Sequence, residues 1–158
     1  MKNLNFGAHS AQRVAVFIDT QNLYHSARSN YRANVNYQEL LNRAVSERQL
    51  VRAFAYVIKS EEGTEEKFHE AIEELGIEIR IKDLQIFHTG AKKADWDVGL
   101  TVDAIRLAPS LDAVVIVSGD GDYISLVEYL QKSSGKQVEV VAFGETASHK
   151  LLEVADDF

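Results

Sequence analysis

Short apolar runs rich in β-branched residues recur along this chain, and helix-like patterns separate them. The segments 14–19 (VAVFID) and 113–118 (AVVIVS) are nearly continuous apolar runs, which is the pattern of strands covered on both faces. The segments 50–58, 77–81 and 138–143 also predict strands. Strands that alternate with helices favour a mostly parallel sheet with helices on both faces and right-handed crossovers. We therefore expect an α/β fold with five strands.

Helical patterns fall between these predicted strands. A polar turn from Thr20 leads into a predicted helix through Tyr24 and Arg28. Asn36 and Glu39 form a capping-box pattern, which predicts the start of the next helix. Further helices are expected around Phe68, from Asp97 to Pro109, from Tyr123 to Leu130 and from His149 to Ala155, with a polar loop at 89–93.

The totals favour one domain in a reducing compartment. With 158 residues, 46% of them hydrophobic, the chain can bury one sizeable core but is short for two. We expect an N-terminal tail at 1–11 and a single domain at 12–158. The sequence has no apolar stretch of roughly 20 residues for a membrane helix, no signal-peptide pattern and no cysteine for disulfides or thiolate metal sites. A cytoplasmic location without a membrane partner is the expectation.

The formal net charge of -7 is unfavourable for a phosphate-rich partner, which usually demands a basic surface. The acidity is local, however. Residues 61–78 hold eight acidic side chains and one lysine, and the remaining residues hold 16 acidic and 16 basic ones. Phe68, Ile72 and Leu75 recur at helical spacing in this stretch, so its glutamates are predicted to form the solvated face of an amphipathic helix.

Polar side chains follow the first and the fourth predicted strands. Asp19 and Asn22 follow the first strand, and Ser118, Asp120 and Asp122 follow the fourth. Ligands of open α/β sheets bind outside the carboxyl ends of the strands. If these two strands are neighbours, they lie about 5 Å apart and their terminal side chains can share one cation.

A divalent cation would neutralise carboxylates that otherwise repel one another and raise each other's pKa values. Mg²⁺ or Mn²⁺ suits an all-oxygen ligand set and usually keeps several waters. Such an ion can activate water and stabilise the charge that develops on a phosphodiester during hydrolysis. The pattern therefore predicts a nuclease-type metal site.

A structural role is the alternative for each acid taken singly. Asp19 and Asp122 precede predicted helices, where aspartate is a favoured N-cap, whereas Asp120 and Asp97 have no comparable structural task. An EF-hand does not fit residues 118–122, because the required glutamate at loop position twelve is missing and an apolar helix follows.

The mid-chain segment KKADWDVGLTVDAI adds further acids at the start of a predicted helix. Asp97 lies in the first turn and is the stronger metal candidate. Asp103 lies six residues later, a net rotation of about 240°, so the two side chains point to different faces. Asp103 is therefore a marginal site residue, and pairing with Arg106 or a bond to a neighbouring loop is at least as good an interpretation.

With these residues in order, the chain resembles the NYN domain, in the LabA-like branch of the PIN-like nuclease superfamily. The similar segments are VAVFIDTQNLY, WDVGLTVDAI, VVIVSGDGDYISLVEYL and HKLLEVADDF, in the family's order. The resemblance implies a Rossmann-like three-layer sandwich with five strands in the order 3-2-1-4-5. That order would make the first and fourth strands neighbours.

The resemblance also implies roles. Asp19 and Asn22 match the family's first acid and its accompanying amide, Asp97 the mid-chain acid, and Asp120 and Asp122 the late pair. The implied activity is Mg²⁺- or Mn²⁺-dependent hydrolysis of phosphodiesters, usually of RNA, and members without catalysis are also expected. In this hypothesis three acids hold the metal, while Asp122 and Asn22 support its waters. Ser118 would orient a carboxylate or a water.

Candidate substrate contacts follow the first strand. Tyr24, Arg28, Tyr31 and Arg32 could supply phosphate contacts and base stacking, and an ordinary helix surface is the alternative. Lys93 is a further phosphate-binding candidate.

The basic residues before the mid-chain acid depart from the family pattern. The family often has a Lys-Gly pair closer to this acid, whereas Ala94 and Asp95 intervene here between Lys93 and Asp97. This departure also makes Asp95 an alternative match for the mid-chain acid, but the spacing to Leu100 and Asp103 favours Asp97.

The rival functions keep or replace this site. A regulator that binds RNA or a protein without turnover would keep the same fold, and a homodimer is compatible with either function. A phosphatase of the haloacid dehalogenase type needs a second acid at the position of Gln21. Dinucleotide and P-loop binding are disfavoured, because the GxGxxG and GK[ST] signatures are missing.

Overall fold

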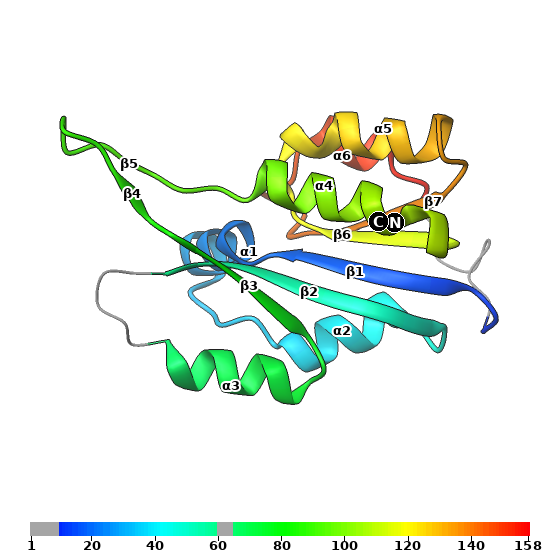
Figure 1. Cartoon of the computed structure of the whole chain (residues 1–158), viewed down its shortest axis with the longest axis horizontal. Coiled ribbons are helices and arrows are strands. Elements are labelled where there is room, and N and C mark those ends of the chain that lie inside the picture. Colours follow the sequence, from blue (N-terminus) through cyan, green and yellow to red (C-terminus); the bar gives the residue numbers. More distant parts are fainter. Residues whose placement is uncertain (1–9, 60–64) are drawn as a thin grey trace.

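Five parallel strands form the central sheet of the computed structural model, which describes residues 10–59 and 65–158 (Figure 1). The strand order is β3-β2-β1-β6-β7, and every neighbouring pair is parallel. Counted along the sheet-forming strands, this is the predicted order 3-2-1-4-5, so the α/β class and the strand order are confirmed. The strands are β1 (Arg13–Asp19), β2 (Gln49–Lys59), β3 (Glu78–Asp83), β6 (Ala113–Val117) and β7 (Gln137–Val141).

Helices cover both faces of this sheet and make it a three-layer structure. Figure 1 shows α2 and α3 below the sheet and α4, α5 and α6 above it. The helices are α1 (Thr20–Ser26), which continues as the π-helix η1 (Ala27–Tyr31), α2 (Tyr37–Val45), α3 (Glu66–Glu74), α4 (Asp97–Leu107), α5 (Ile124–Lys132) and α6 (His149–Val154), with short 3₁₀ turns η2 (Ala108–Ser110) and η3 (Gly121–Tyr123).

Strand β1 lies at the centre of the sheet because its side chains are apolar on both faces. Val16 and Ile18 pack with α2 and α3, whereas Ala15 and Phe17 pack with α4, α5 and α6. Phe17 is fully buried and stacks on Phe54 of β2, with ring centroids 5.6 Å apart. Burial of one such ring stabilises the fold by about 2–3 kcal/mol. The continuous apolar pattern of the sequence thus reports two covered faces.

Most predicted elements are found, with local differences. Asn36 caps α2 by accepting from the Glu39 amide, but the Glu39 carboxylate binds Arg43 instead of completing the capping box. Helix α1 starts at Thr20 without an intervening turn, because Asp19 caps it directly. The predicted loop at 89–93 contains one strand of a small antiparallel hairpin, formed by β4 (Gln85–Ile86) and β5 (Lys92–Lys93). Two pairs of residues are too few to give a strand pattern in the sequence.

Within residues 10–59 and 65–158, no helix is long and apolar enough to span a membrane.

Candidate active site

The Asp19 carboxylate is fixed at the carboxyl end of β1 by groups from two neighbouring strands. One oxygen, Oδ1, accepts from the Asn22 backbone amide at 3.2 Å and so caps α1. The other, Oδ2, accepts from the Ser118 hydroxyl at 3.1 Å. Ser118 follows β6, which pairs directly with β1. The expected adjacency of the first and fourth strands is confirmed, and it brings the two strand ends together.

Asp19, Asp97 and Asp120 form one cluster of carboxylates. One oxygen from each lies within 4.8 Å of the other two. Asp97 is the first residue of α4, and Asp120 lies in the loop between β6 and η3. Among the residues that the structure describes, this is the one group of three or more His or acidic side chains close enough to hold a metal ion.

Burial and mutual repulsion make this cluster electrostatically unfavourable when all three acids are ionised. Burial is the largest cause that raises the pKa of Asp19 above its ordinary value. Burial also raises the pKa of Asp97, to about 6, and the negative charges of Asp120 and Asp95 raise it further. A bound cation would relieve both effects.

Tyr123 belongs to this site, although the sequence analysis did not select it. Its hydroxyl lies 3.2 Å from Asp97 Oδ1 and 3.5 Å from Asp19 Oδ2, within donating distance of both carboxylates. Burial and the two nearby negative charges raise the pKa of Tyr123, so the phenol keeps its proton. An aromatic residue at the start of a helix usually signals core packing, so the sequence gave no reason to assign Tyr123 to the site.

The loop after β6 holds Asp120 through a chain of hydrogen bonds. The Ser118 hydroxyl accepts from the Asp120 amide at 3.2 Å, and the Asp120 carboxylate accepts from the Asp122 amide at 2.9 Å. Asn22 contributes its side-chain oxygen, which accepts from the Gly119 amide at 2.9 Å. Asn22 and Ser118 therefore tie the acidic loops together.

Two expectations about capping are wrong. Asp120 was expected to have no structural task, but it is the N-cap of η3. Asp122 was expected as a cap, but it lies inside that 3₁₀ turn with an exposed side chain. Asp122 also stays outside the carboxylate cluster. The physical reason is that the turn starts two residues earlier than the apolar helix pattern indicates.

Asp103 is directed away from the cluster. Its carboxylate accepts from the Tyr56 hydroxyl at 2.8 Å and forms an ion pair with Arg80 at 3.2 Å. Its partners therefore lie on β2 and β3, and neither the Arg106 pairing nor the loop contact suggested by the sequence is found. The neighbouring Asp95 accepts from the Asp97 amide at 3.3 Å. It supports the start of α4 without joining the cluster.

The four expected substrate contacts after β1 separate in the structure. Arg28 lies over the Tyr24 ring, 5.7 Å from its centroid, and both side chains are exposed. Tyr31 packs against Phe143, and Arg32 ends η1 in a left-handed conformation with an exposed side chain. The side chain of Lys93 lies outside the described part of the molecule.

Comparison with known proteins assigns the family. The model of the NYN domain matches residues 13–158. The chain belongs to the NYN domain family. It is 26% identical to the low amplitude and bright protein LabA of Synechococcus elongatus, over 96% of this chain and 84% of that protein.

A solved structure supports the NYN fold. The crystal structure of a protein of unknown function from Vibrio parahaemolyticus is 37% identical, with a TM-score of 0.88 over 96% of this chain and 93% of that one. The resemblance stated from the sequence is therefore confirmed at the level of family and fold.

Proposed function

We propose that this NYN domain is a metal-dependent ribonuclease that hydrolyses phosphodiester bonds at the cluster of Asp19, Asp97 and Asp120. The observation that supports this proposal most directly is the approach of three carboxylate oxygens to within 4.8 Å of one another. Such a cluster destabilises a protein unless a cation or bound proton offsets the repulsion. Its position at the carboxyl edge of the sheet is where ligands of open α/β folds bind.

The donor set fits Mg²⁺ or Mn²⁺. All three side chains offer carboxylate oxygens, which these hard cations prefer, and they come from three separate segments that converge on one point. When bound, either ion would supply an activated water and stabilise negative charge on the phosphate. Asp19, Asp97 and Asp120 are the residues that would hold it.

The surrounding groups would act on the carboxylates and on the substrate. The Ser118 hydroxyl and the Asn22 amide orient Asp19 by donating to its two oxygens. Asp122 is exposed beside the cluster and would hold water there. Arg28 and Arg32 are exposed near the carboxyl edge and would bind phosphates of the RNA chain. Lys93 remains a further phosphate-binding prediction.

Cleavage assays with matched variants test this function. Single-stranded and structured RNA are incubated with the protein in Mg²⁺, in Mn²⁺ and in EDTA. We expect cleavage only with metal, and a loss of about 100-fold or more in Asp97→Asn and Asp120→Asn, because each change removes a charged ligand. Asp112→Asn is the control, since Asp112 pairs with Arg13 at the opposite end of the sheet.

Two outcomes would contradict the nuclease proposal. Cleavage that persists in EDTA and in both cluster variants would come from another site or another protein. RNA binding without cleavage in either metal would instead favour a regulator that retains the fold.

A further inference from the structure

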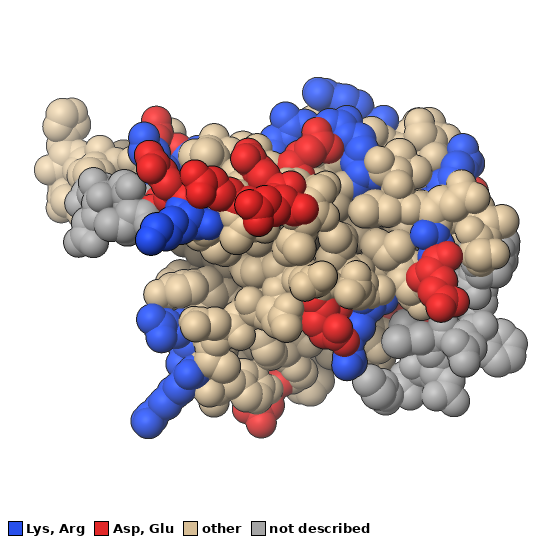
Figure 2. Space-filling model, turned by 90° about the horizontal axis from the view of Figure 1, so that it is seen from below, with Lys and Arg blue, Asp and Glu red and all other residues tan. Residues whose placement is uncertain are grey.

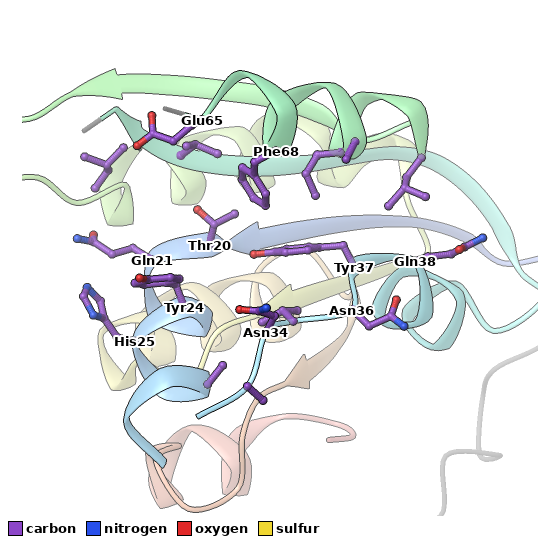
Figure 3. A pocket seen from close by; sticks show the side chains of 18 of the residues that line it. Thr20, Gln21, Tyr24, His25, Asn34, Asn36, Tyr37, Gln38, Glu65 and Phe68 are labelled. Carbon is purple, nitrogen blue, oxygen red and sulfur yellow. The ribbon is translucent and has the colours of Figure 1, made fainter. Parts of the chain in front are cut away.

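A second concave site lies on the other face of the sheet, at the same carboxyl edge as the acidic cluster. It is a cleft of about 930 Å³ between α1, the start of α2, and α3 (Figure 3). Pockets of 300–1,000 Å³ are typical of sites that bury most of a small organic group. The cleft is therefore large enough for a heterocycle with part of its sugar.

The lining is apolar and aromatic, with amides in place of charges at its centre. Val57, Ile72 and Leu75 supply aliphatic surface. Tyr37 and Phe68 meet edge to face at one side of the cleft, with ring centroids 5.6 Å apart. This surface suits a flat, uncharged ring better than a phosphate.

Polar groups with free hydrogen-bonding capacity face this apolar surface. Within the part of the chain that the structure describes, the Tyr37 hydroxyl and the side-chain amides of Gln21 and Asn34 make no hydrogen bond to protein. Figure 3 shows these groups around the cleft, with the Tyr24 ring beside them. Tyr24 is 54% exposed, so one ring face is open to a stacking partner. Amides and an open aromatic face are the groups that read an unstacked nucleobase.

The cleft and the acidic cluster adjoin each other through consecutive residues. Asp19 belongs to the cluster, and the next two residues, Thr20 and Gln21, line the cleft. The pKa of Tyr37 is raised to about 12, first by burial and then by the negative charge of Asp19. An electrostatic effect of Asp19 on Tyr37 requires that the two groups lie near each other.

Charge around the cleft also favours one orientation of a polyanion. On the α1 side, Arg28 lies over Tyr24, and Lys59 lines the rim. On the opposite side, α3 exposes Glu66, Glu70 and neighbouring acids, which gather on the face shown in Figure 2. A phosphate backbone would be attracted to the α1 side and repelled from α3.

We propose that this cleft binds one nucleobase of a single-stranded RNA, the base of a nucleotide next to the phosphodiester held at the acidic cluster. The proposal rests on the proposed nuclease function for the identity of the ligand. The base stacks on Tyr24 and bonds to the Tyr37 hydroxyl and the amides of Gln21 and Asn34. The cleft then selects which bond of a single strand is cleaved.

Binding of RNA hexamers that lack one base tests this assignment without cleavage. Asp97→Asn protein is titrated with fluorescein-labelled hexamers, each abasic at a different position, and anisotropy gives the Kd. We expect one abasic position to weaken binding about tenfold, since stacking of one base contributes a factor of this order. Adding Tyr24→Ala should remove this difference. Tyr129→Ala should not, because Tyr129 is an equally accessible tyrosine on α5, 44% exposed.

A filling variant guards against loss of structure in Tyr24→Ala. Ala71 is exposed on α3 and lines the cleft, so Ala71→Trp fills it without removing a polar group. It should abolish the sensitivity to the abasic position in the same way. Glu70→Trp, one residue earlier and outside the cleft, is its control.

The outcomes separate the two proposals. If the wild-type protein cleaves RNA but all abasic positions behave alike, or the cleft variants change nothing, the base site is wrong and the nuclease proposal stands. If one abasic position matters and the cleft variants abolish the effect while no RNA is cleaved, the base site stands and the nuclease proposal fails. If a free nucleoside such as uridine or adenosine binds the cleft but RNA does not, the RNA assignment is overturned.

Discussion

The Tyr123 hydroxyl lies 3.2 Å from Asp97 Oδ1, so a neutral phenol donates to one of the carboxylates that would hold a metal ion. Hydrogen bonds that fix a ligand in place usually tune metal affinity as well as geometry. Because Asp19 Oδ2 lies 3.5 Å from the same hydroxyl, this one group can orient two of the three acids. Tyr123 is therefore a positioning residue in the proposed site.

Replacement of this hydroxyl should weaken metal binding. In Tyr123→Phe, Asp97 loses a donor that lowers its pKa, so its carboxylate holds a proton more tightly in competition with the cation. We expect the Mn²⁺ concentration for half-maximal cleavage to rise about tenfold at neutral pH. Titration of cleavage rate against Mn²⁺ measures this shift.

The control for Tyr123→Phe is Tyr129→Phe, which removes an exposed hydroxyl on α5. It should leave the Mn²⁺ dependence unchanged. A uniform loss of rate in Tyr123→Phe that saturating Mn²⁺ does not reduce, with an unchanged half-maximal concentration, would argue against the positioning role.

The fold was predictable because the strands are buried on both faces. A run such as Val14 to Ile18 has no polar residue to interrupt it, so its sequence identifies a central strand. The hairpin of β4 and β5 was not predictable, because two residue pairs leave no periodic signal. The start of η3 was also misplaced, since a 3₁₀ turn has no apolar stripe of its own.

The cluster was predictable in part for a different reason. Acids at the ends of two adjacent parallel strands must meet, so Asp19 and Asp120 could be paired from the sequence once the strand order was assumed. Asp97 followed from its place in the first turn of α4. Tyr123 and the cleft were not predictable, because both depend on how side chains from separate segments converge.

Neutralising Asp97 should stabilise the metal-free protein in a pH-dependent way. The pKa of Asp97 is raised from 3.8 to about 6, so the folded state binds this proton more tightly than the unfolded state does. Stability therefore falls as pH rises from about 4 to about 6, and the cost of ionisation is fully present above that range. Asp97→Asn removes this cost at pH 7.5 but has little to remove at pH 4.

The measurement is thermal unfolding in EDTA at the two pH values. Asp97 is partly exposed and lies at a helix N-terminus that favours its charge, so we expect a gain of only about 1 kcal/mol, or about 2–4 °C in Tm, at pH 7.5. Asp122→Asn, at an exposed acid outside the cluster, should change Tm by less than this. An equal gain at pH 4 and pH 7.5 would show that ionisation of Asp97 is not the cause.

Gly119 should be required for the position of Asp120. A Cβ atom at Gly119 would come within 2.9 Å of the Ala147 Cα, a backbone atom that cannot turn aside as a side chain can. The Gly119 amide also donates to the Asn22 side chain, so any displacement of this loop disturbs the link between the two acidic segments. Gly119→Ala is therefore expected to lower metal-dependent cleavage about 10- to 100-fold, through a small shift of Asp120.

The matched control is Gly144→Ala, where an added Cβ meets no atom within 4 Å. It should leave both cleavage and Tm unchanged, because neither a contact nor a left-handed backbone opposes the methyl group. Metal-dependent cleavage and Tm are measured for both variants. If Gly119→Ala lowers Tm but cleaves at the wild-type rate below its unfolding temperature, then the loop tolerates displacement, and the precise placement of Asp120 is not what limits catalysis.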